Sequence, residues 1–443
     1  MRSTIFFSLA LSAGAMLLPI RSRAAAASVA WSPGETVAFF GDSITQNGHQ
    51  IFQLQLWQVL RHPGVPVRLV NIGKSGDWVG GAMGRWPWDG RSVKADRLFV
   101  MFGMNDIGLP LWRTVEPSDA ANAAARERKL RVFEGDFKSL ANMIAGDARD
   151  VMILTPSPYD VWSSVPADNR AGADGALARI AGITRHVASD LGMNLIDLHT
   201  PMAEFYRTHP ELKLNGDRIH PGETGSLLMS TLIWKALGET NEIGHLELDA
   251  KGATTVSVEY VPKALPFPDS AAYRTLRPHW PLLEELNREV LCVRGLPSGR
   301  YVVSADEKHL GTYLAEDLSR GLNLALLETP SLHRSREADL TREKLRKQVE
   351  QLRSVLIYAH EAERAVGCAN QKAVDLWLAA ELSKPKCDGW RRRCLALVRE
   401  HYPVLQQRKN EVDSLYEKLL AVRPMTYRLS VSPCRKEKER IAF

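Results

Sequence analysis

VAFFGDSITQNG, residues 37–48, is the stretch that decides the fold, because it predicts a buried strand running straight into a tight turn. Its first four residues form the continuous apolar run typical of a strand covered on both faces, and Gly41 has the backbone freedom to leave a sheet sharply. A helix pattern starts near Gln50. This order places the turn at the carboxyl edge of a parallel sheet, where a helix N-terminus points at it. Ser43 is therefore a candidate nucleophile, although on these residues alone a plain helix cap by Asp42 or Ser43 is an equally good interpretation.

Strand patterns alternate with helix patterns over the following 190 or so residues. Each predicted strand ends in a polar loop that contains Gly or Pro. Such alternation predicts an α/β fold built on a doubly wound parallel sheet. The further strands are expected at 65–72, 97–102, 150–154 and 193–198, and the helices at 120–145, 173–191 and 223–237.

The pattern of apolar residues changes near Gly238, which predicts further domains after it. Residues 239–330 have alternating apolar residues punctuated by Gly and Pro turns, which favours antiparallel strands and a β-rich accessory module. Residues 331–443 predict a helical C-terminal region with a final strand that could return to the β-module. Apolar residues that recur every three or four positions, from Leu345 to Ala359, favour a core-facing stripe. The candidate nucleophile Ser43 falls in the first domain, residues 31–238.

Residues 1–30 have the features of an export signal. Arg2 lies in a short basic region, residues 5–18 are apolar, and small residues follow. We expect an exported protein, periplasmic or extracellular. The apolar run is shorter than the roughly 20 residues that span a bilayer, so no stable membrane insertion is expected after the signal is removed. Because Arg21 and Arg23 follow the apolar run, an uncleaved membrane anchor is the alternative interpretation of this segment.

The charge distribution argues against a nucleic-acid partner. The chain of 443 residues has a net charge of +6, and outside residues 1–30 the excess of Lys and Arg is confined to residues 331–443, which contain 24 of them against 15 acidic residues. No basic motif there is interleaved with aromatic residues, so a solvated helical face is the better interpretation. The five cysteines lack metal-ligand spacing. We expect no disulfide framework, no metal and no cofactor.

Five residues supply the groups that acyl transfer needs: a nucleophile, a base, a group that orients the base, and oxyanion donors. Ser43 would attack, His220 would accept its proton, and Asp217 would orient the imidazole. The backbone amides of Ser43 and Gly76 and the side-chain amide of Asn105 follow neighbouring strands and could form the oxyanion hole. Taken singly, the Asp-x-x-His motif is more typical of a structural turn, the glycine of a loop and the asparagine of a cap.

The four segments that hold these residues resemble the signature blocks of the SGNH (GDSL-type) hydrolases. They are GDSI at 41–44, SGD at 75–77, GMND at 103–106 and DRIH at 217–220. The resemblance covers roughly residues 34–238. It implies a flavodoxin-like, three-layer fold, ester hydrolysis through an acyl-enzyme, and the roles given above to the five residues. The methionine in the third block departs from the small residue of many members and would narrow the site.

Aromatic residues crowd the expected rim of this site and bear on the substrate. In the segment Trp86-Pro87-Trp88 the proline stiffens the backbone, so both tryptophans could form a platform that stacks on sugar rings. The alternative is that they pack loops onto the sheet. Further rim candidates are Trp78, Trp112, Tyr159 and Trp162.

These observations together predict a secreted serine esterase that acts on O-acyl groups of carbohydrate, most simply O-acetyl groups. The substrate would be a small-molecule or polysaccharide ester. A lipase or aryl esterase on the same scaffold is one alternative, and a non-catalytic carbohydrate-binding or surface protein is another. The oligomeric state is left open.

Overall fold

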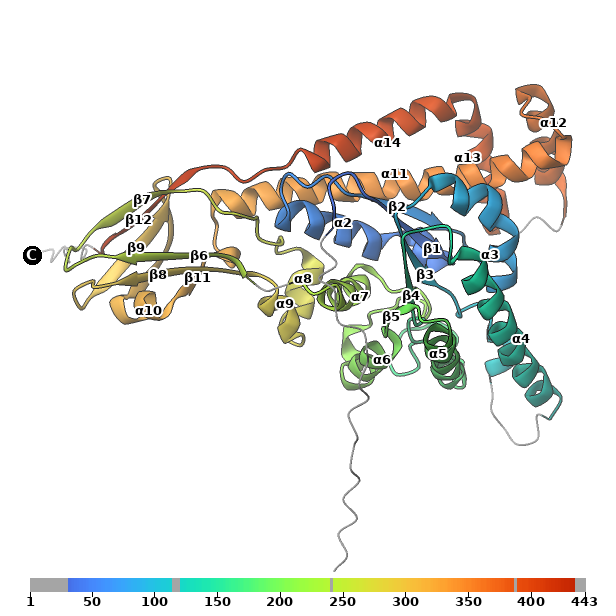
Figure 1. The fold of residues 1–443 in the computed structure, drawn as a ribbon, viewed down its shortest axis with the longest axis horizontal. Helices are drawn as coiled ribbons and strands as arrows, with labels where there is room; N and C mark the ends of the chain where they lie inside the picture. Colours follow the sequence, from blue (N-terminus) through green and yellow to red (C-terminus); the bar gives the residue numbers. More distant parts are fainter. Residues whose placement is uncertain (1–30, 114–119, 240–241, 386–388, 435–443) are drawn as a thin grey trace, which may run out of the picture.

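The structure is a computed structural model that describes residues 31–113, 120–239, 242–385 and 389–434. The predicted export signal, residues 1–30, lies outside the described residues. The molecule is elongated, with the predicted accessory strands at one end and a parallel sheet near the other (Figure 1).

The sheet of the N-terminal domain has five strands in the order β2-β1-β3-β4-β5, and all of its pairings are parallel. This is the flavodoxin-like order, and it confirms the predicted α/β fold. In such a sheet the ligand crevice lies outside the carboxyl ends of the strands, where the strand order reverses, here beside β1. The strands are β1 (Thr36–Gly41), β2 (Arg68–Gly73), β3 (Arg97–Met101), β4 (Asp150–Leu154) and β5 (Asn194–Ile196).

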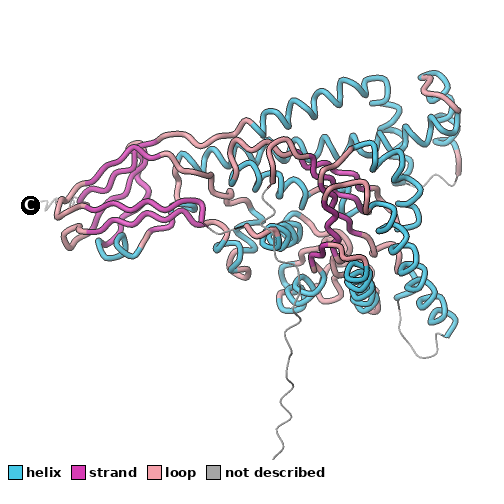
Figure 2. Tube along the Cα trace, viewed as in Figure 1, coloured by secondary structure: helices cyan, strands magenta, loops and turns pink. Residues whose placement is uncertain are grey.

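The helices of this domain form two groups. Helix α2 packs on α7, whereas α4 packs on α3 and α5. Figure 2 shows the helices lying to either side of the strands. The helices are α1 (Ser43–Asn47), α2 (His49–Arg61), α3 (Val79–Arg85), α4 (Ala120–Ile144), α5 (Ala173–Asp190), α6 (His199–Thr208) and α7 (Glu223–Ala236).

The turn after β1 has the tight geometry that its sequence predicts. A Cβ atom at Gly41 would lie 2.1 Å from Thr45 Oγ1 and 2.6 Å from the carbonyl oxygen of Met101, so only glycine fits there. Asp42 then caps α1, because its Oδ1 accepts a hydrogen bond of 2.9 Å from the amide of Ile44. The helix therefore begins at Ser43, earlier than expected, and breaks at Gly48 before α2.

The accessory module contains two small sheets, in the orders β10-β9-β12-β7 and β11-β8-β6. The first is antiparallel, as expected, and the C-terminal strand β12 lies between β7 and β9. The expectation is wrong for β6 and β8, which pair in parallel because the chain crosses over through α8 and α9 between them. The elements are β6 (Glu242–Asp249), β7 (Val256–Tyr260), α8 (Ala271–Leu276), α9 (Pro281–Glu285), β8 (Arg288–Arg294), β9 (Arg300–Ala305), β10 (Lys308–Leu314), α10 (Ala315–Arg320), β11 (Leu322–Asn323) and β12 (Tyr427–Pro433).

The helical region is dominated by α11 (Pro330–Val366), a 37-residue helix capped by Thr329. It runs from the accessory module along the parallel-sheet domain (Figure 1) and packs against α2 and α14. Leu345, Val349 and Ala359 are buried, which confirms that the stripe faces a core. The remaining helices are α12 (Gln371–Ser383), α13 (Gly389–His401) and α14 (Leu405–Leu420). Among the described residues, no helix combines the length and apolar character that a membrane crossing requires.

Candidate active site

Three strands deliver the candidate residues to one edge of the sheet. Gly41, the last residue of β1, is the register partner of Gly73 at the end of β2 and of Met101 at the end of β3. The loops that carry Ser43, Gly76 and Asn105 therefore leave the sheet side by side.

Ser43, His220 and Asp217 form a continuous hydrogen-bonded chain. The Oγ atom of Ser43 lies 2.7 Å from Nε2 of His220, and Nδ1 of His220 lies 2.6 Å from Oδ2 of Asp217. A carboxylate can only accept, so the Nδ1 atom bears the proton and Nε2 is left to accept from the serine. The other oxygen of Asp217 accepts from the amides of Ile219 and His220 at 3.0 and 2.8 Å, which fixes the carboxylate.

The two members of the Asp-His pair shift each other's pKa. Burial alone would raise the pKa of Asp217, but hydrogen bonds from the side chain and backbone of His220 lower it to about 2. Burial alone would lower the pKa of His220, but the hydrogen bond and charge of Asp217, helped by the charge of Asp42, raise it above its ordinary value of 6.5. Asp42 itself is fully buried behind the serine, and this burial raises its pKa to about 7.

Arg218, inside the Asp-x-x-His motif, holds the turn in place. Its backbone has a φ of +70°, and its buried guanidinium donates to carbonyl oxygens of the neighbouring loop. No periodicity or spacing in the sequence indicates this role. The one hint in the sequence is that an arginine lies within the motif, between the candidate catalytic residues Asp217 and His220. The acceptors are the carbonyls of Asp160, Ser163, Val165 and Ala167, at 2.8 to 3.0 Å.

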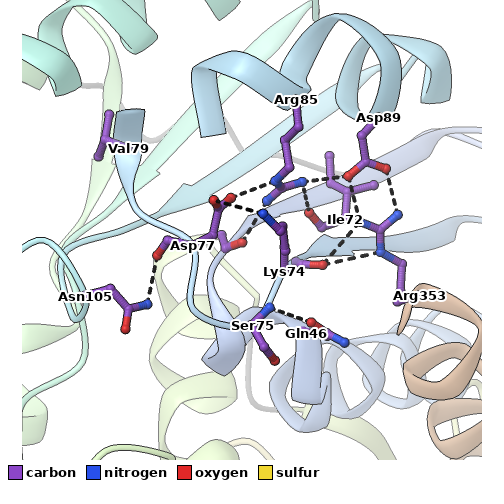
Figure 3. Close-up of polar contacts among 12 residues, drawn as sticks. Gln46, Ile72, Lys74, Ser75, Asp77, Val79, Arg85, Asp89, Asn105 and Arg353 are labelled. Atoms are coloured by element: carbon purple, nitrogen blue, oxygen red, sulfur yellow. Dashed lines mark hydrogen bonds and ion pairs between the residues drawn. The ribbon is translucent and has the colours of Figure 1, made fainter. Parts of the chain in front are cut away.

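Two of the three predicted oxyanion donors, Gly76 and Asn105, border a hollow of about 300 Å³. Gly76 has a φ of +73°, a conformation that favours glycine. Asn105 donates one N–H of its amide to the carbonyl oxygen of Asp77 at 2.8 Å (Figure 3), which leaves its second N–H for a substrate oxygen. The residues that line the hollow are Gly76, Trp78, Asn105, Asp106, Lys129, Val132 and Phe133.

The predicted tryptophan platform is wrong for Trp86. Its side chain is only 2% exposed, its Nε1 donates to Asp147 at 2.6 Å, and its ring packs edge-on against Phe40 of β1. Trp88 is half-buried and stacks on His360 of α11, with ring centroids 3.7 Å apart. The physical reason is that Trp86–Gly90 winds into a π-helical turn, which points the first ring into the core and the second toward the C-terminal helices.

Trp86→Ala should lower the free energy of unfolding by about 3–5 kcal/mol, because it leaves a cavity beside Phe40 in the core. Denaturant unfolding of the two variants Trp86→Ala and Trp88→Ala measures this, and the half-buried Trp88 should show the smaller loss. Equal stability of Trp86→Ala and the wild type would contradict the core assignment.

Of the two aromatic residues that line the hollow, Trp78 and Phe133, only Trp78 is exposed. Its side chain is 51% exposed and lines the hollow together with Gly76 and Asn105. Trp78 directly follows the second block, SGD at 75–77, and this position indicates a place beside the site as strongly as the Trp-Pro-Trp segment does. Exposure of a large aromatic ring beside polar donors is typical of a recognition surface.

Sequence comparison places this site in a known family. The profile of the GDSL-like Lipase/Acylhydrolase family matches residues 39–228, which include the whole Ser-His-Asp chain. Residues 39–228 therefore form a domain of the GDSL-like hydrolase type. This confirms the resemblance stated above, and the protein is accordingly a hydrolase of ester bonds.

Similar proteins extend the comparison beyond this domain. An acetylxylan esterase from Geobacillus stearothermophilus is 22% identical over 221 residues, covering 46% of this chain and 94% of that protein. The structure of BT4096, a gut microbial diltiazem-metabolizing enzyme, is 24% identical with a TM-score of 0.81, covering 91% of this chain and 98% of that chain. The structure of the acetylxylan esterase Axe2 from Geobacillus stearothermophilus has a TM-score of 0.38 and 21% identity, covering 47% of this chain and 96% of that chain. The fold shared with BT4096 thus extends through the accessory and helical regions.

Among the described residues, one group has side chains close enough to hold a metal ion: His245, Glu247 and Cys292, whose ligand atoms lie within 4.8 Å of one another. Linear spacing could not reveal it, because β6 and β8 become neighbours only in the folded sheet. The group belongs to the accessory module, and Glu247 also accepts a hydrogen bond from Arg294 at 3.3 Å.

Proposed function

We propose that the protein is an exported serine esterase that removes short acyl groups, acetyl above all, from carbohydrate. The single observation that carries this proposal is the Ser43–His220–Asp217 chain, with distances of 2.7 and 2.6 Å, at the same sheet edge as two oxyanion-donor loops. A non-catalytic binding protein would have no need of that alignment.

The arrangement supports a two-step acyl transfer. Ser43 Oγ attacks the acyl carbon while His220 Nε2 accepts its proton. The backbone amides of Ser43 and Gly76 and the side-chain amide of Asn105 donate to the oxyanion. Collapse of this intermediate breaks the bond to the alcohol, which leaves with the proton from His220. A water molecule then attacks the acyl-enzyme with the same base, releases the carboxylic acid and restores the serine.

The size of the hollow supports a short acyl group. It measures about 300 Å³ and is bordered by polar as well as apolar residues, including Asp106 and Lys129. A carbohydrate alcohol is supported by the exposed ring of Trp78 at its edge and by the sequence similarity to an acetylxylan esterase. Export is supported by the signal pattern in residues 1–30.

The test is a comparison of ester substrates with the purified protein. Acetylated xylo-oligosaccharides and a series of simple esters with acyl chains of two to ten carbons are hydrolysed in a pH-stat, with aryl acetates as a third group. Preference for the acetylated oligosaccharide supports the proposal. Preference for long acyl chains would show a lipase, and preference for aryl acetates an aryl esterase.

Trp78→Ala should lower kcat/KM for acetylated xylo-oligosaccharide about tenfold, as expected for loss of an aromatic contact. Ethyl acetate, which fills only the oxyanion hole and nucleophile, should react at the wild-type rate. Trp390→Ala is the matched control, because that ring is also exposed but lies on α13. Equal losses on both substrates would refute sugar recognition by Trp78.

A further inference from the structure

Helix α11 contacts the two segments of the parallel-sheet domain that carry the nucleophile and an oxyanion donor. It packs against α1, which begins with Ser43, and against β2, which leads into the loop of Gly76. Its Arg353, 6% exposed, donates to the carbonyl oxygen of Gly73 at 3.2 and 3.4 Å. A residue of the C-terminal region thus binds the last residue of β2, directly before the loop that carries Gly76.

Arg353 also begins a chain of buried ion pairs (Figure 3). It forms two hydrogen bonds of 2.7 Å with the carboxylate of Asp89, one to each oxygen. Asp89 pairs in turn with Arg85 at 2.7 Å, and Arg85 pairs with Asp77 at 2.6 Å. All four side chains are buried, and the two positive and two negative charges balance. Burial alone would raise the pKa of Asp89, but Arg353 and then Arg85 outweigh it and lower that pKa, so the carboxylate stays ionised.

The chain of ion pairs ends at the oxyanion hole. Asp77 follows Gly76 directly, and its carbonyl oxygen accepts the hydrogen bond that orients Asn105. Arg85 also donates to the carbonyl of Gly41 at 3.0 Å and to that of Ile72 at 2.8 Å. The network therefore joins the carboxyl ends of β1 and β2 to Gly76 and Asn105, two of the three predicted oxyanion donors.

A second connection runs through Gln46, on the helix that begins with Ser43. Its Nε2 donates to Oγ of Ser354 on α11 at 2.9 Å, and its Oε1 accepts from the amide of Ser75 at 2.5 Å (Figure 3). Arg346, two turns earlier on α11, donates to the carbonyl oxygen of Asn47 at 2.9 Å. Helix α11 thus holds the nucleophile segment and the oxyanion loop together.

We propose that Arg353 is a positioning residue for ester hydrolysis: it fixes the loop of Gly76 and, through Asp89, Arg85 and Asp77, the amide of Asn105. This inference rests on the proposed function. Oxyanion donors accelerate a reaction only if they are already in place when charge develops, and small displacements weaken them steeply. A buried ion pair adds little net stability, but its fixed fork geometry sets the position of what it binds. The C-terminal helical region is in this sense part of the catalytic unit.

The test compares Arg353→Gln with the wild type, using ethyl acetate and titrated active sites. Arg353→Gln leaves Asp89 paired with Arg85, so no buried carboxylate loses its last partner. We expect kcat per active site to fall tenfold or more, KM to change less than twofold, and the acid limb of the pH profile to stay in place. Arg336→Gln is the matched control: this arginine lies on the same helix but binds Asp269 and Glu328, and its kcat should not change.

Arg353→Lys provides a second variant that keeps the charge but not the two-point fork, and it should restore part of kcat. Unchanged kcat in Arg353→Gln would overturn the inference, as would a loss explained wholly by fewer titratable sites or by a higher KM. These outcomes differ from a failure of the proposed function, in which the wild type itself would not hydrolyse esters and the inference would fall with it.

Discussion

Ser43→Ala will abolish ester hydrolysis, with a loss of roughly 10⁶-fold in kcat, the scale seen when the nucleophile of a serine hydrolase triad is removed. The oxygen that attacks is the one 2.7 Å from the base, and no other hydroxyl is bonded to His220 among the described residues. The melting temperature should stay close to that of the wild type, because Ser43 is only half-buried at the start of α1 and Asp42, not Ser43, caps that helix.

The nucleophile can also be identified without turnover. A phosphonate ester should label the wild type at one position, and mass spectrometry of the peptide that contains residues 41–48 locates it. Ser139→Ala, on the exposed face of α4, serves as control and should react like the wild type. Residual activity of Ser43→Ala above one part in a thousand would refute the assignment.

Asp217→Asn should lower kcat by about 10⁴-fold while leaving the fold intact. An asparagine carbonyl can still accept the two backbone amides that Asp217 Oδ1 now binds, so the turn is retained. Its amide group cannot accept from Nδ1 of His220, which therefore adopts the wrong tautomer for receiving the serine proton. Initial rates together with circular dichroism separate this chemical defect from unfolding.

The pH profile provides the control for this assignment. His220 must be neutral to act as a base, and its pKa is raised above 6.5, so kcat/KM is lost as the pH falls through a value above 6.5. Asp217, with a pKa of about 2, stays ionised throughout that range. In Asp217→Asn the acid limb of the pH profile should move to lower pH, because His220 loses the hydrogen bond and the charge that raise its pKa. A flat wild-type profile between pH 5 and 8 would contradict a histidine base.

Local sequence patterns were sufficient to predict the parallel sheet and to select Ser43, Asp217 and His220, which the structure joins by hydrogen bonds. A strand, a glycine that alone fits the turn, and a capped helix are all encoded within residues 37–48. The family match then agrees with the blocks from which the residues were chosen.

Features that depend on contacts distant in sequence were not predictable in the same way. Trp86 and Trp88 have the same local chemistry, but only the folded chain decides that one ring packs beneath β1 and the other on His360. The partners Arg353 and Asp89 are likewise 264 residues apart. No periodicity connects such pairs, because their meeting depends on how α11 packs on the sheet domain.

The place of β12 between β7 and β9 has a consequence for the order of folding. One wall of the accessory sheet comes from residues 256–260 and 300–305, whereas the strand that joins them is almost the last described part of the chain. Until that strand is synthesised, β7 and β9 expose unpaired backbone groups, which can pair with other chains. Closure over so long a loop is slow. The accessory module therefore cannot be excised as one continuous fragment, and a chain truncated before Tyr427 should aggregate through these open edges.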